Sequence, residues 1–174
     1  DLVVRRAAEG LAIELASAAE LGGRKATINV TADFRGLNAP VALEFVVQDL
    51  DPAALAAAFP LPALEPLKAL AAPLSGSASL RVAPGDRLEA ATFDLSGGRG
   101  ALRLPDQLSA PLPFESFAVI GSYAPEGEAL RLQDVYVDLG DHLSVQFSGL
   151  LWRAAEGIGA TGEGSLGALK VDSL

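Results

Sequence analysis

The stretch Leu130-Arg131-Leu132-Gln133-Asp134-Val135-Tyr136-Val137-Asp138-Leu139 carries the feature that decides the fold of this chain. Its apolar side chains stand at even positions, 130 and 132, and then at odd positions, 135, 137 and 139. Successive side chains of a strand point to opposite faces, so one added residue turns the rest of a strand inside out unless a β-bulge absorbs it. The sequence therefore predicts a bulge between Leu132 and Val135.

The same change of face occurs in Leu88-Glu89-Ala90-Ala91-Thr92-Phe93-Asp94-Leu95, whose first apolar residues are even and whose last three are odd. The two stretches and their flanking turns look like diverged copies at an offset of about 44 residues, which is the length of a repeat unit. Because a bulge bends its strand and increases the local twist, two bulges predict a curved sheet.

Outward from these stretches, period-two alternation at 11–15, 28–34 and 41–47 and regular turn signals after Ser77 predict a long antiparallel meander. Asp51 and Pro52 are typical of a helix N-cap and first helical position, and a second short helix is expected near 66–71, with Leu67 and Leu70 facing inward. The fold class predicted is mainly β: a curled antiparallel β-meander forming a groove or a partly open barrel.

The meander is expected to carry one short helical insert, over about residues 51–72. The chain is read as a single domain, 1–174, or a fragment of a longer repetitive protein, with a Gly-rich strand region at 153–174. One short insert is little cover for an apolar sheet face. The remaining solutions are a sandwich, a closed barrel, or a groove closed by a ligand or by neighbouring repeats.

Composition narrows the function classes. Half of the 174 residues are hydrophobic, only 6% are aromatic, and there is no cysteine, so neither disulfides nor a cysteine-based zinc site is possible. Thirteen basic and 22 acidic residues give a net charge of -9, which argues against a nucleic-acid partner and against electrostatic adsorption to anionic lipid. No segment reads as a signal peptide or membrane span, and we expect any targeting segment to lie outside this sequence.

Residues that could carry chemistry are few. His142 is the only histidine, and with Asp138, Asp141 and Ser144 nearby it could form a nucleophilic triad, but a solvated histidine in a turn is favoured. The acidic residues form no spaced ligand cluster, so no metal and no cofactor is predicted. Two GxGxxG matches within 157–167 have no following helix and are interpreted as coincidence. Trp152 is favoured as a partly buried anchor over a binding platform.

The segment Val46-Val47-Gln48-Asp49-Leu50-Asp51-Pro52-Ala53-Ala54-Leu55, with Ala72-Pro73-Leu74-Ser75-Gly76 after it, resembles the central region of AsmA-like bacterial proteins, especially the YhdP type. So does the pairing of 91–95 with 130–140. The resemblance spans about residues 10 to 150. It implies a periplasmic protein with an apolar β-groove, anchored in the inner membrane by a segment absent here. It also implies a role in phospholipid transport to, or homeostasis of, the outer membrane, with no catalytic residues.

The preferred hypothesis is a non-enzymatic lipid-handling module whose partners are phospholipid acyl chains and adjacent β repeats of the parent protein. Burial of apolar surface is non-directional and suits lipids with varied head groups. The alternative is a structural or protein-interaction β domain of the cell envelope, with its groove filled by its own side chains. The residues expected to line the groove are Phe93, Leu95, Val135, Val137, Leu139, Leu143, Val145 and Phe147.

Overall fold

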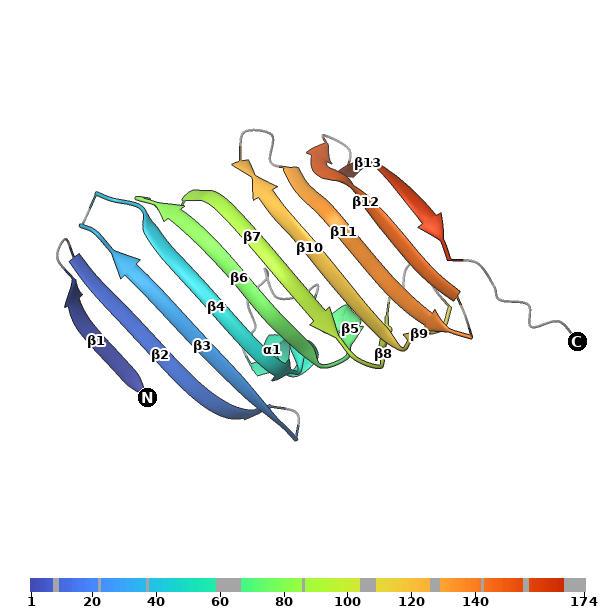
Figure 1. Ribbon diagram of the computed structural model, residues 1–174, viewed down its shortest axis with the longest axis horizontal. Helices are drawn as coiled ribbons and strands as arrows, with labels where there is room; N and C mark the ends of the chain where they lie inside the picture. The colour runs from blue at the N-terminus through green and yellow to red at the C-terminus, as the bar shows by residue number, and fades with distance from the viewer. Residues whose placement is uncertain are drawn as a thin grey trace, which may run out of the picture.

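The computed structural model describes residues 1–7, 10–21, 23–36, 38–58, 67–85, 87–103, 109–125, 129–141, 143–154 and 157–167. Within them, ten strands form one antiparallel sheet in the order of the chain (Figure 1). The sheet is curled and does not close into a barrel, as the predicted curled meander requires. The strands are β1 (Leu2–Ala7), β2 (Gly10–Leu21), β3 (Arg24–Phe34), β4 (Val41–Leu50), β6 (Leu74–Ala83), β7 (Arg87–Gly97), β10 (Ser116–Ala124), β11 (Ala129–Gly140), β12 (Leu143–Ala154) and β13 (Gly157–Leu166).

Both predicted bulges are present, but the second precedes Ala90, so that Ala90 lies on the outer face and not, as its even position predicted, beside Leu88. In β11, Leu132 pairs with Gly121 of β10 and Asp134 pairs with Ile120, so Gln133 is the extra residue. In β7, Leu88 pairs with Val82 and Ala90 with Arg81, which leaves Glu89 as the extra residue. Glu89 and Gln133 are separated by the offset that the sequence repeat predicts. The two bulged hairpins, β6–β7 and β10–β11, are therefore built alike.

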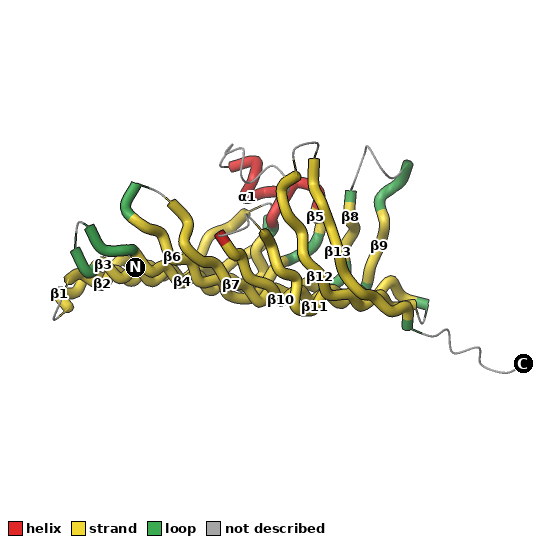
Figure 2. The backbone as a smooth tube through the Cα atoms, turned by 90° about the horizontal axis from the view of Figure 1, so that it is seen from above, coloured by secondary structure: helices red, strands yellow, loops and turns green. Residues whose placement is uncertain are grey.

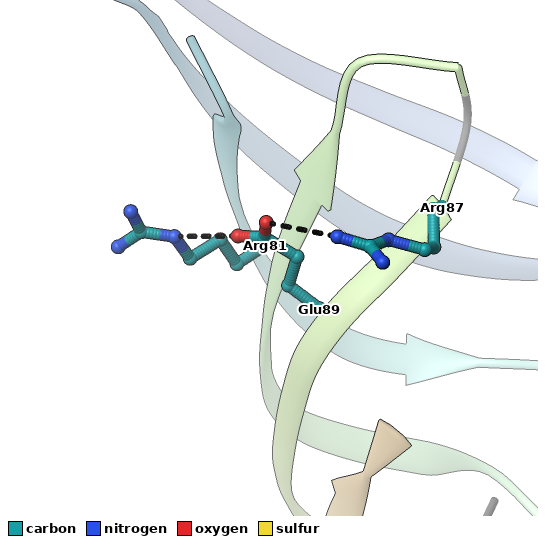
Figure 3. Close-up of polar contacts among 3 residues, drawn as sticks. All are labelled: Arg81, Arg87 and Glu89. Atoms are coloured by element: carbon teal, nitrogen blue, oxygen red, sulfur yellow. Dashed lines mark hydrogen bonds and ion pairs between the residues drawn. The ribbon is translucent and has the colours of Figure 1, made fainter. Parts of the chain in front are cut away.

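Polar side chains at each bulge find partners across the sheet. Figure 3 shows the Glu89 carboxylate between two arginines: Arg81 Nε donates to Oε2 at 3.1 Å, and Arg87 Nη2 lies 3.8 Å from Oε1. In the second hairpin, Gln146 Nε2 donates to Asp134 Oδ1 at 2.8 Å. Such exposed contacts add little stability. They do hold the polar residues of the bulge on the opposite face from Leu88 and Leu132.

The register aligns apolar side chains into rows that cross all or most of the main sheet on one face, here called the inner face. One row consists of Leu2, Leu15, Val30, Phe45, Ala78, Phe93, Gly121, Leu132, Gly149 and Gly162. Another, near the opposite strand ends, consists of Leu50, Leu74, Gly97, Phe117, Val137, Val145 and Leu166. The outer face carries mostly polar residues such as Ser79, Thr92 and Asp94.

Two insertions fold over the inner face. The chain leaves the main sheet after β4 to form α1 (Pro52–Ala58) and β5 (Leu70–Ala71), and again after β7 to form β8 (Gly100–Leu102) and β9 (Leu112–Phe114). β5, β8 and β9 make a small antiparallel sheet. Figure 2 shows α1 and these strands on one side of the main sheet, the side toward which β12 and β13 bend. We call α1, residues 67–69, β5, β8 and β9 the roof.

The helical insert is confirmed in its first half and corrected in its second. Asp51 caps α1: Ala54 N donates to its Oδ1 at 2.9 Å, and Leu55 N donates to its main-chain oxygen at 3.0 Å. The second helix expected near 66–71 is wrong beyond one turn, because 67–69 form a single 3₁₀ turn and 70–71 are strand β5. A two-residue strand is too short for alternation to reveal.

The prediction of a single interruption is also wrong, since β8 and β9 form a second one. Each strand is three residues long, and Pro111 and Pro113 break any alternation in the approach to β9. What makes these residues strands is pairing within the small sheet. β8 pairs with β5, which lies some thirty positions earlier, through Leu70 with Leu102 and Ala71 with Ala101, and β9 pairs with β8. Alternation within a short stretch of sequence cannot reveal a pairing partner that is distant in the chain.

The core lies under α1 and β5. Ala26, Leu50 and Leu74 are buried together, and partly buried side chains from the roof (Leu55 and Leu70) and from the sheet pack against them. Large side chains on the inner face away from the roof stay exposed: Leu2 is 65% exposed and Leu166 is 73% exposed. The insertions therefore divide the inner face into a roofed part and an open part.

Candidate functional site

An apolar cavity of about 460 Å³ lies between the roof and the main sheet. Its roof side is formed by Leu67, Leu70, Leu102, Leu112 and Phe114. Its floor comes from three neighbouring strands of the main sheet and consists of Phe117, Val119, Val137, Leu139 and Val145. All of these are leucine, valine or phenylalanine, so no described lining side chain offers a hydrogen bond. We call this space the roofed cavity.

Aromatic rings and glycines shape the floor. Phe117 and Gly97 face each other across β10 and β7, and a Cβ on Gly97 would overlap the Phe117 ring. Phe93 covers Gly121 in the same way two rows further along. A ring that lies over a cross-strand glycine covers bare backbone and stays low on the sheet. The floor is thus smooth, and space remains above it.

Phe114 fixes the roof to this floor. It is 4% exposed, and its ring meets that of Phe117 edge to face, with centroids 5.5 Å apart and planes at 88°. This geometry is favourable for aromatic pairs. Beside it, Arg99 and Glu115 close the base of the β8–β9 hairpin: Nη2 and Nε of Arg99 lie 2.6 and 2.7 Å from Glu115 Oε2.

A second, smaller hollow of about 240 Å³ lies on the open part of the inner face, over β11, β12 and β13. Its apolar lining includes Leu132, Phe147 and Leu151, with Gly149, Gly162 and Gly164 giving a floor without side chains. The register joins it to the roofed cavity, because Val119 of the cavity floor is followed along its row by Val135 and then Phe147. We call this space the open hollow.

The residues expected to line a groove do share the inner face, but they have different surroundings. Val137, Leu139 and Val145 line the roofed cavity. Phe147, 38% exposed, lines the open hollow. The others lie between or beside these spaces: Val135 is 6% exposed, Leu95 packs against the core, Phe93 covers Gly121, and Leu143 is half-buried.

Seven lining residues of the roofed cavity were not among those expected. The two floor residues, Phe117 and Val119, alternate with Ser116, Ala118 and Ile120, so period-two reading of that strand could have found them. Leu67 and Leu70 were expected only as inward-facing residues of a short helix, whereas Leu102, Leu112 and Phe114 carry no such signal. They belong to elements of three residues or fewer, and tertiary contact alone brings them over the sheet.

Of the residues considered for a nucleophilic triad, the structure describes Asp138, Asp141 and Ser144. His142 lies outside the described residues, and the Asp138 carboxylate accepts a hydrogen bond from Gly140 N at 2.9 Å within the turn. That turn, predicted at 140–141, has positive φ at Gly140 and Asp141. Among the residues that the structure describes, no three metal-ligating side chains are grouped. Both GxGxxG matches overlap β13 and join no strand to a helix within the described part.

Trp152 is half-buried on the outer face, and a Cβ on its cross-strand partner Gly159 would overlap the indole. This matches an anchor that covers bare backbone. In the described ranges, no helix has both the length and the apolar character needed to cross a membrane.

Comparisons with family models, with curated proteins and with solved structures find no match for this chain. The resemblance to AsmA-like proteins therefore stays a prediction, and the function is argued from the inner face itself.

Proposed function

We propose that this chain is a non-enzymatic lipid-handling module that shields phospholipid acyl chains from water on its inner face. The observation that carries the proposal is the apolar inner face, which crosses the whole sheet and is covered only in part by the roof. Transferring apolar surface out of water is favourable at roughly 25 cal/mol per Å². An acyl chain laid along the uncovered rows would gain this energy, and it needs no specific polar contact.

The distribution of exposed apolar residues supports the proposal. Leu2, Val4, Leu11 and Leu15 on the inner face of β1 and β2 are between 40% and 65% exposed. Together with Phe147 and Leu166 near the other edge, they extend the apolar surface beyond the roof on both sides. Contiguous apolar surface of this kind marks interaction sites. The AsmA-like resemblance adds the expected setting: the periplasm, with the parent protein anchored in the inner membrane and phospholipid moving toward the outer membrane.

The test compares two aromatic residues that differ in the face they occupy. Phe147 on the inner face is 38% exposed, and Tyr136 on the outer face of the neighbouring strand is 37% exposed. The chain is incubated with vesicles of phosphatidylethanolamine and phosphatidylglycerol, reisolated, and its lipid content measured by mass spectrometry. We expect Phe147→Glu to reduce the lipid carried at least tenfold, whereas Tyr136→Glu leaves it unchanged, since a carboxylate beside an acyl chain must be desolvated.

If both variants carried the same amount of lipid, the inner face would not be the surface that binds it. A wild-type chain that carries no lipid would refute the proposal as a whole.

The alternative, a structural β domain that pairs with neighbouring β repeats, is favoured by one observation: the free edge of β1. Asp1 N donates to Ala16 O at 2.6 Å and Ala16 N donates to Asp1 O at 2.9 Å, so odd residues of β1 bond to β2. Even residues such as Val4 then point their N–H and C=O groups to the open edge. The alternative would be supported if the wild-type chain pairs with a neighbouring β repeat at this edge and carries no lipid, and if Val4→Pro abolishes that pairing.

A further inference from the structure

The roofed cavity differs in kind from the rest of the inner face, because it is bounded above and below. Its ten described lining residues carry only hydrocarbon side chains. The strands above it are paired among themselves: β8 bonds to both β5 and β9, which occupies the main-chain donors and acceptors of the roof's middle strand. A polar group placed here would lose its hydrogen bonds to water without replacement. Only hydrocarbon fits the chemistry of the lining.

The size of the cavity fits one chain. A volume of about 460 Å³ corresponds to about fifteen water-sized volumes of roughly 30 Å³. A methylene group is similar in size to a water molecule, so a chain of about fifteen carbons fills the space. Two chains side by side, or a ring system with polar substituents, would need more room or hydrogen-bonding partners.

One side of the cavity is closed and another is open. Toward β4 and β6, Leu70 and Phe117 belong both to the cavity lining and to the packing around Leu50 and Leu74, so the core blocks that end. Toward β13, the floor continues from Val145 to Leu166, which is 73% exposed. The row through Phe147 also leads to the open hollow. A chain can therefore enter from the β12–β13 side and end against the core.

We propose that the roofed cavity receives the methyl end of a single unbranched acyl chain and that its length sets a chain-length preference. This inference rests on the proposed lipid-handling function and adds that the cavity which takes the acyl chain is a dead end, closed by the core. The part of the lipid nearer the head group lies over the open hollow, and the head group itself stays outside, in solvent. The roof therefore selects for chain length and straightness, and the open face accepts any head group.

The experiment measures binding of a series of saturated fatty acids, octanoate, decanoate, laurate, myristate, palmitate and stearate, to the full 174-residue chain by calorimetry below their micellar concentrations. While added methylenes enter the cavity, affinity should rise about fourfold for each one. Beyond about fifteen carbons the cavity is full and the increase should become much smaller.

Matched variants test whether the cavity sets the chain length at which affinity stops rising steeply, which we call the break. Val137→Phe narrows the cavity and should move the break to shorter acids, whereas Leu102→Ala enlarges it and should move the break to longer acids. Val30→Phe is the control: Val30 is also half-buried on the inner face, but lies on β3 outside the cavity lining, and the break should stay where it is. Opposite shifts from two variants cannot both result from partial unfolding.

The two proposals fail separately. If the wild-type chain binds the acids but its series shows no break, or the break is the same in all variants, the dead-end cavity is refuted and lipid handling on the open face stands. If neither fatty acid nor phospholipid binds the wild-type chain, the proposed function itself is refuted, and the cavity inference falls with it.

Discussion

The roofed and the open parts of the inner face belong to one sheet with the same alternation, yet their side chains are covered to very different degrees. Under the roof, Leu50 is 4% exposed and Leu74 is 8% exposed. On the open part, Leu2 and Leu166 are 65% and 73% exposed. A curled sheet with one apolar face does not bury that face by itself. Burial here comes from two short insertions, and the rest of the inner face stays exposed.

The largest effect is expected from changing the phase of β11, which supplies the cavity floor. Deleting Tyr136 either moves Val137 and Leu139 to the outer face or, if the bulge at Gln133 closes instead, turns Val135 outward and Asp134 inward. At roughly 1.5–3 kcal/mol per apolar side chain, the loss is about 3–6 kcal/mol. That is a large fraction of the 5–15 kcal/mol typical of whole domains. Urea unfolding followed by circular dichroism measures the change.

Deleting Gln133 is the matched control for this experiment. Without it, Leu132 pairs with Gly121 and Gly149, and Asp134 can pair with Ile120 and Ser148, so both ladders become regular and every side chain keeps its face. The expected cost is on the order of 1 kcal/mol. Equal destabilisation by the two deletions would contradict the reading of Gln133 as the inserted residue.

An intermediate effect is expected at the roof anchor. Phe114→Ala removes a buried ring and its edge-to-face contact with Phe117, and should destabilise the chain by about 3–5 kcal/mol. On the open part, Leu15 is 40% exposed, and Leu15→Ala should cost less than about 1 kcal/mol. The change in the free energy of unfolding of each variant is obtained from the midpoint of its urea unfolding curve, provided that the dependence on urea concentration is unchanged. A small loss at Phe114 would mean that the roof contributes little to stability.

The smallest effect is expected for the ion pairs. Arg99 and Glu115, at the base of the roof, make two contacts of 2.6 and 2.7 Å, whereas Arg5 and Glu14, on β1 and β2, make one of 3.6 Å. Double-mutant cycles with alanine should give a coupling of about 0.5–1 kcal/mol for the first pair and about 0.2 kcal/mol for the second. High salt should weaken both. A stronger coupling in Arg5–Glu14 would reverse the comparison.

Much of the main sheet could be predicted from the sequence, because its strands are long. Alternation over ten or more residues identifies strand and face, and the two shifts in phase placed bulges within two residues of Gln133 and Glu89, where the structure has them. The capped start of α1 at Asp51 was equally local. In the candidate site, the same alternation placed Val137, Leu139 and Val145 on the inner face. Each of these predictions depends on residues close together in the chain.

Tertiary structure alone decided what covers that face. Leu70 and Leu102 become strand residues only by pairing with each other across the gap between two insertions, and Phe114 becomes a roof residue only by packing on Phe117. Elements of two or three residues are too short to express a period, so their state is set by distant partners. The sequence by itself determined a curled sheet with one apolar face. Contacts between segments far apart in the chain decided which part of that face is buried and which part encloses a cavity.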